Sequence, residues 1–174
     1  MKIGNVVRER AEVVIGWRAW LVTETADGLR LGSVLYDLDW PVGEPALAEC
    51  RSLEAGPRPH PVPGPLCACG FYAARDPADA LSYVIGRDDP STVCRILGEV
   101  ALWGHVLETE SGWRGSHAYP VRLFVPDVSL ARRLSSYGVS VSSASCASPS
   151  SPTCTAMRSR SVPRSPISRP AGRI

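Results

Sequence analysis

Long hydrophobic runs are absent from this 174-residue sequence, in which each uninterrupted apolar stretch covers only a few residues. A membrane-spanning helix needs about 20 consecutive apolar residues, so the sequence predicts no membrane span. An apolar signal region is missing too, because Glu9 and Glu12 interrupt the segment that would have to carry it. We therefore expect a cytoplasmic protein, where reducing conditions disfavour disulfides and favour free or metal-bound cysteines.

Acidic residues are missing after residue 139, where five arginines remain, and Lys2 is the one lysine of the chain. Residues 1–139 therefore hold 14 basic and 17 acidic side chains. This mildly acidic balance argues against a nucleic-acid-binding core, which normally presents a basic face. The sequence also lacks a phosphate-binding glycine loop, a Ser-His-Asp order and a dinucleotide fingerprint.

The composition divides the chain into two parts. With 44% apolar and 21% charged residues, the sequence is typical of a soluble globular protein, and we expect one domain over residues 1–139. Residues 140–174 contain eleven serines and five prolines, which predicts a disordered tail. This tail is open to three interpretations: a basic contact to nucleic acid or an anionic surface, a passive extension, or a shifted reading frame in GC-rich DNA.

The first half of the domain predicts strands followed by a long loop. Residues 12–23 and 29–36 are rich in strand-forming side chains and flank a turn signal at Asp27-Gly28, so we expect a hairpin. Prolines and glycines then fill residues 41–65, which predicts a loop of about 25 residues. A loop of this length needs something to hold it in place.

The second half predicts further strands and two short helices. Residues 70–74 and 118–125 suit single strands, and residues 92–107 suit one bent strand or two strands broken at a glycine. A helix is expected from Asp76-Pro77 to Ile85, and a second one begins at Asp127 and ends at Gly138. The fold class is therefore α+β, mainly antiparallel strands with two short helices.

Three cysteines and a histidine lie in and beside the proline-rich loop, at Cys50, His60, Cys67 and Cys69. Thiolate and imidazole are the ligands that Zn²⁺ prefers, and three sulfurs with one nitrogen complete a tetrahedral structural site. The single residue between Cys67 and Cys69 departs from the spacing of two to four residues that is common in zinc knuckles. Two other interpretations stay open: reduced cysteines packed as small apolar side chains, and a redox pair.

An enzymatic alternative uses other residues. Arg18 on the first core strand, Ser33 on a following strand, and Glu108 and Glu110 late in the chain resemble the order found in ADP-ribosyltransferases. That resemblance implies NAD as the substrate, and in a strand the two glutamates would share one face. The competing interpretation is a solvated hairpin end.

Two Trp-Arg steps occur, Trp17-Arg18 and Trp113-Arg114. Trp17 and Arg18 would face opposite sides of a strand, so we expect one of them to be buried and the other exposed. An exposed tryptophan beside arginine would suit stacking on a partner, whereas a buried one would belong to the core.

Several motifs together carry a resemblance: GWRAW, CACGFYA, LGEVALWG and GWRGSHAYP, spread over residues 16–141. They resemble a group of small actinobacterial and phage or mobile-element proteins, for which no activity is known. The chain departs from that pattern at Gly115, where the group usually has alanine, and after Val141. The sequence as a whole favours a small binding or regulatory module with a structural zinc ion, and NAD-dependent ADP-ribosyl transfer is the alternative.

Overall fold

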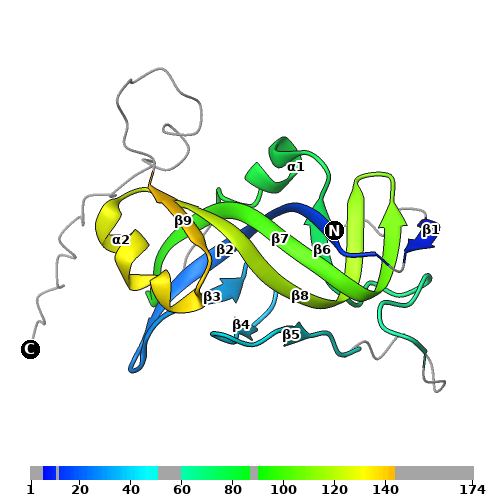
Figure 1. The fold of residues 1–174 in the computed structure, drawn as a ribbon, viewed down its shortest axis with the longest axis horizontal. Coiled ribbons are helices and arrows are strands. Elements are labelled where there is room, and N and C mark those ends of the chain that lie inside the picture. Colours follow the sequence, from blue (N-terminus) through cyan, green and yellow to red (C-terminus); the bar gives the residue numbers. More distant parts are fainter. Residues whose placement is uncertain (1–5, 11, 51–59, 87–89, 144–174) are drawn as a thin grey trace, which may run out of the picture.

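The computed structural model describes residues 6–10, 12–50, 60–86 and 90–143, and strands dominate these ranges (Figure 1). The predicted class, mainly antiparallel sheet with two short helices, is confirmed. The strands are β1 (Val6–Arg10), β2 (Val14–Thr25), β3 (Gly28–Ser33), β4 (Asp39–Trp40), β5 (Ala46–Leu47), β6 (Phe71–Ala74), β7 (Thr92–Thr109), β8 (Gly112–Val125) and β9 (Ser140–Ser143). The helices are α1 (Pro77–Leu81) and α2 (Val128–Arg133).

Four strands close into a ring. β2 pairs with β7, β7 with β8, and β8 with β6, and β6 returns to β2 through the single pair of Trp17 with Ala74. β3 lies on the same side of β2 as β6 but pairs further along it, from Trp20 to Thr25. β3 and β6 therefore share one edge of β2 and separate from each other near Arg18.

The remaining strands extend this ring. β4 adds to β3, β1 to the end of β7, and β5 to β8, all antiparallel. β9 pairs with β8 in parallel. Pairing of this kind satisfies the backbone N–H and C=O groups of the sheet and leaves few open edges.

The predicted hairpin of β2 and β3 is present. Thr25 pairs with Gly28, so the two turn residues are Ala26 and Asp27, one position earlier than the sequence pattern suggested. Gly28 follows the turn with a φ of 115°, a conformation that side chains other than glycine rarely adopt.

β7 and β8 form one long hairpin that bends over the core (Figure 1). β7 is a single strand rather than two, and its register with β8 shifts between Glu99 and Val100 and between Trp103 and Val106. Gly104, in the second shift, has a φ of 77°. Irregularities of this kind bend a strand and increase its twist, which lets the hairpin wrap around the interior.

Two apolar clusters cover the two faces of β2. Trp20 and Val22 point into the main core, where Trp20 meets Trp40 edge to face with ring centroids 5.5 Å apart. Ala19 points the other way and packs with Ala80 and Val84 of the α1 region. Arg18 lies two residues before Trp20 on β2, so the two side chains point to the same face, which is the face of the main core.

Both helices begin as predicted. The Asp76 carboxylate accepts a hydrogen bond from the N–H of Ala78 at 2.8 Å, and the Asp127 carboxylate accepts one from Leu130 at 2.8 Å. α1 ends at Leu81 instead of Ile85, because the following residues form tighter bonds three residues back. Gly138, with a φ of 67°, ends the turn that follows α2, as predicted.

The described domain continues past the boundary predicted at residue 139. Ser140–Ser143 form β9, because their backbone pairs with Arg122–Val125 of β8. The rest of the predicted tail, residues 144–174, lies outside the described residues, and so do residues 51–59 of the proline-rich segment. None of the helices in the described ranges is long and apolar enough to span a membrane.

Candidate metal centre

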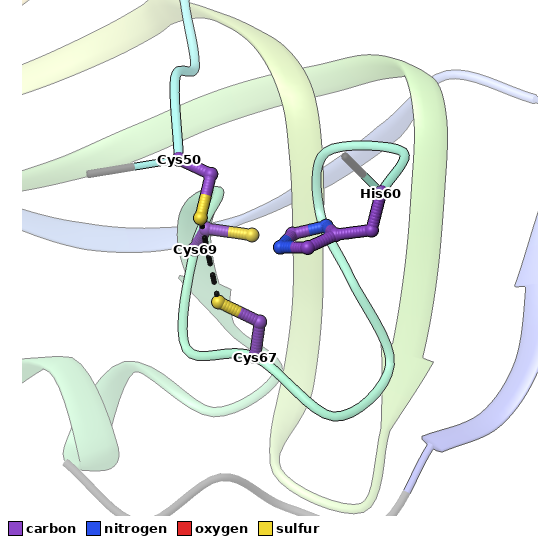
Figure 2. Close-up of side chains that lie close together, drawn as sticks. All are labelled: Cys50, His60, Cys67 and Cys69. Carbon is purple, nitrogen blue, oxygen red and sulfur yellow. Dashed lines mark hydrogen bonds between the residues drawn. The ribbon is translucent and has the colours of Figure 1, made fainter. Parts of the chain in front are cut away.

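Cys50, His60, Cys67 and Cys69 lie together at one end of the sheet, and their side chains point toward one another (Figure 2). Cys50 comes shortly after β5, whereas His60, Cys67 and Cys69 belong to the segment that leads into β6. The four residues are therefore brought together because β5 and β6 both pair with β8. The sequence-based prediction that these side chains gather is confirmed.

The distances suit a tetrahedral ion. The four ligand atoms lie within 4.8 Å of one another, and the sulfurs of Cys50 and Cys67 are 3.6 Å apart. With Zn–S bonds of about 2.3 Å, tetrahedral geometry places two sulfurs about 3.8 Å apart, so the largest separation needs to shrink by only about 1 Å. A disulfide would require about 2 Å between sulfurs, and these cysteines are free thiols.

His60 presents the correct nitrogen to this cluster. Its Nδ1 lies 2.7 Å from the carbonyl oxygen of Pro61 and donates a hydrogen bond to it, since a carbonyl can only accept. This bond leaves Nε2 with a free lone pair in the neutral ring. Nε2 is buried and has no hydrogen-bond partner among the described residues. Metal-binding histidines commonly have this arrangement, in which the second ring nitrogen donates to a carbonyl and fixes the ring.

Gly64 fits the space between two of the ligands. Its N–H donates a hydrogen bond to the Cys69 sulfur at 3.2 Å. A Cβ atom at this position would lie 2.6 Å from Nδ1 of His60, so any larger residue would displace the imidazole. The absence of a side chain at Gly64 therefore has a structural reason in the position of His60.

The three carbonyls of Cys67, Ala68 and Cys69 are held by two side chains of the sheet. Arg114 Nη1 donates to the carbonyl of Cys67 and, at 3.3 Å, to that of Cys69. The hydroxyl of Tyr72 donates to the carbonyl of Ala68 at 2.9 Å. Tyr72 and Arg114 are direct partners across β6 and β8, so the sheet register sets the shape of the cysteine loop.

The pKa values of two of the thiols indicate that full ionisation of the cluster requires a positive charge. Burial raises the pKa of the Cys67 thiol, but interactions with Cys69, Cys50 and His60 outweigh burial and lower that pKa to about 7. Burial raises the pKa of Cys69 to about 11, and the nearby Cys67 adds to the rise. Closely spaced thiols cannot all ionise unless positive charge compensates them. A divalent cation supplies that charge and replaces the protons.

Arg114 supplies a further positive charge beside the cluster. It is 1% exposed, and three thiolates with one divalent ion would leave a net charge of −1 for it to balance. Its Nε and Nη2 are buried without a hydrogen-bond partner in the described part of the chain. A buried guanidinium is costly unless an opposite charge is close, so this position favours an anionic metal–thiolate centre.

Sequence reasoning missed Arg114, Tyr72 and Gly64 as parts of the site. In the second Trp-Arg step, Arg114 is buried and Trp113 is partly exposed. In the other step, Trp17 and Arg18 are both partly buried. The expectation that one of Trp17 and Arg18 is buried and the other exposed fails because apolar clusters cover both faces of β2.

The residues of the enzymatic alternative are not all brought together. Arg18 and Ser33 line one cavity, but neither glutamate is among the described residues that line it. Glu108 is 7% exposed and forms a salt bridge with Arg75 at 2.9 Å. Glu110 lies exposed in the turn between β7 and β8, so the two glutamates do not share a strand face.

Comparison of the chain with protein-family models, with curated proteins and with solved structures finds no match.

Proposed function

We propose that this chain is a small binding or regulatory module in which a structural zinc ion, held by Cys50, His60, Cys67 and Cys69, fixes the proline-rich segment to the sheet. One observation carries the proposal: four donor atoms, all from residues 50–69, lie within 4.8 Å of one another. Nε2 of His60 supports it too, because this atom is buried without a hydrogen-bond partner in the described part of the chain, and a packed core would leave its hydrogen bond unmet.

A structural role fits better than a catalytic one. Catalytic zinc sites keep one coordination position for water or substrate, whereas four protein ligands fill a tetrahedral shell. The donor set of three sulfurs and one nitrogen favours zinc over magnesium or calcium, which prefer oxygen ligands.

The energetics also favour this role. The loop between Cys50 and Cys67 spans 17 residues, and closing a loop of this size costs about 3 kcal/mol in chain entropy. Structural zinc in small domains contributes about 10 kcal/mol or more, so ion binding can hold the segment where apolar packing is scarce.

The test is metal analysis of the full chain expressed with zinc available, together with two single-cysteine variants. We expect about one zinc per chain in the unaltered protein, loss of the ion in Cys67→Ser, and full retention in Cys94→Ser. Cys94 is the matched control because it lies on β7 and outside the cluster. Protein that contains no zinc, or zinc retained by Cys67→Ser, would refute the proposal.

A further inference from the structure

A cavity of about 720 Å³ opens beside the metal centre, at the place where β3 and β6 separate along the edge of β2. Ser33 at the end of β3, Arg18 of β2 and Tyr72 of β6 line it. Cys69 also lines it, so the cysteine loop forms part of one wall. The size lies within the range of sites that enclose small organic ligands.

Arg18 is the cation of this cavity, and its charge has no anionic partner among the described residues. Nη1 donates to the carbonyl of Tyr72 at 2.7 Å, and Cζ lies 5.0 Å from the centre of the Trp40 ring. Nε is buried without a hydrogen-bond partner in the described ranges. No carboxylate of the described residues lies within ion-pair distance of Arg18. The guanidinium thus keeps unused donors.

Burial lowers the pKa of Arg18 to about 10, so the group keeps its charge at neutral pH but loses solvation. The Trp40 ring compensates part of this loss through a cation–π contact. A bound carboxylate or phosphate would compensate far more, since the planar guanidinium forms paired hydrogen bonds with such anions.

The rest of the lining suits a flat ring. Five aromatic side chains line the cavity, Trp17, Tyr36, Phe71, Tyr72 and Tyr83, and rings of this kind bind planar groups by stacking. Two acidic residues of the lining, Asp37 and Glu49, are exposed. Their charges disfavour a ligand that carries further negative groups away from Arg18.

We propose that this cavity binds a small molecule consisting of a flat ring and one anionic group, a carboxylate or a phosphate, and that Arg18 binds the anion. The proposal concerns binding without cleavage, because Glu108 and Glu110 lie elsewhere. It goes beyond the structural role of the ion, since Arg18 and the aromatic lining do not belong to the proposed metal ligands and only Cys69 is shared between the cluster and the cavity wall.

The test uses two matched probe pairs and the full chain, with calorimetry as the readout. One pair is 2-naphthoate and its neutral amide, and the other is AMP and adenosine, so that a carboxylate and a phosphate are examined separately. We expect the anion of at least one pair to bind tenfold or more tightly than its neutral counterpart. The probe pair in which the anion binds more tightly than its neutral counterpart shows whether the cavity prefers a carboxylate or a phosphate.

Variants then assign the preference to Arg18. Arg18→Gln is expected to abolish the preference, while Arg122→Gln, an exposed arginine of β8 outside the cavity, keeps it. Tyr36→Ala is expected to weaken the anionic and the neutral probe by the same factor, because Tyr36 is 64% exposed and contributes ring contact alone.

A second measurement covers the case in which Arg18→Gln does not fold. The Nε–H resonance of Arg18, assigned by its absence in Arg18→Lys, should shift when the anion is added and stay in place with the neutral probe. Equal affinity for both members of each pair, no binding of any probe at millimolar concentration, or an unchanged preference in folded Arg18→Gln would overturn the proposal.

Discussion

The metal centre and the neighbouring cavity each contain an arginine that approaches Tyr72, but the two charges have different surroundings. Arg114 contacts the Tyr72 ring and donates to the carbonyls of two cysteines. Arg18 donates to the Tyr72 carbonyl and faces a cavity in which none of the described carboxylates pairs with it. The comparison shows how surroundings separate two similar cations: Arg114 is bonded to the cysteine loop on one edge of β6, whereas Arg18, on the other edge, faces the cavity where we propose that it binds an anion.

The two arginines differ in the groups that would lose a hydrogen-bond donor or a balancing charge if each were replaced. Removing Arg114 would expose two carbonyls to an apolar environment and remove the charge that balances three thiolates. Removing Arg18 would free one carbonyl beside an open cavity, where water can replace the lost donor. The two arginines can therefore be compared directly by the same substitution.

Arg114→Met should have the largest effect. We expect the free energy of unfolding to fall by about 3–5 kcal/mol, the usual cost of removing one partner from a buried charged network. Zinc should also dissociate more easily. Urea denaturation of the zinc-loaded protein measures the first effect and chelator competition the second. A loss below about 1 kcal/mol would show that the cysteine loop does not depend on this arginine.

Gly64→Ala tests the metal centre without altering any charge. The new methyl group would displace the His60 ring, so we expect zinc affinity to fall about 10- to 100-fold, as for other changes that misplace a ligand. Gly32→Ala is the control, because a Cβ there would lie at an ordinary contact distance of 3.6 Å from Leu21. Unchanged affinity in Gly64→Ala would exclude His60 as a ligand.

The pH dependence of zinc binding tests whether the Cys69 thiol loses its proton when the ion binds. In the metal-free protein the raised pKa of Cys69, about 11, keeps a proton on that sulfur at neutral pH, and the bound ion must displace it. Affinity should therefore rise with pH, by about tenfold per unit for each proton released. Competition with a chelator at pH 7, 8 and 9 measures this slope. A flat profile would mean that Cys69 stays protonated and does not bind.

Arg18→Met should have the smallest effect on stability. We expect a change in unfolding free energy within about 1 kcal/mol, because the loss of one hydrogen bond is offset by removing a poorly solvated charge. The same urea measurement as for Arg114→Met applies. A loss of about 3 kcal/mol or more would show that Arg18 is structural and would remove the contrast between the two arginines.

The sequence predicts most of the fold because its signals are local. Asp76-Pro77 and Asp127 start helices, and the alternation around Trp20 defines a strand face. The four proposed metal ligands are indicated by residue type, since thiolate and imidazole are the ligands that zinc prefers. Each of these signals depends on neighbours in the chain.

The parts that could not be predicted depend on contacts between distant residues. Arg114 becomes a structural residue only because the register of β6 and β8 places it beside Tyr72 and under the cysteine loop. Gly64 is needed because of where His60 lies, and the cavity at Arg18 exists because β3 and β6 separate. Short-range patterns contain none of this information.

X-ray absorption at the zinc edge of the full chain tests the central claim most directly. The account predicts three sulfur atoms at about 2.3 Å and one nitrogen at about 2.0 Å from the ion, with no oxygen in the shell. A shell dominated by oxygen and nitrogen, or one with fewer than three sulfurs, would contradict it.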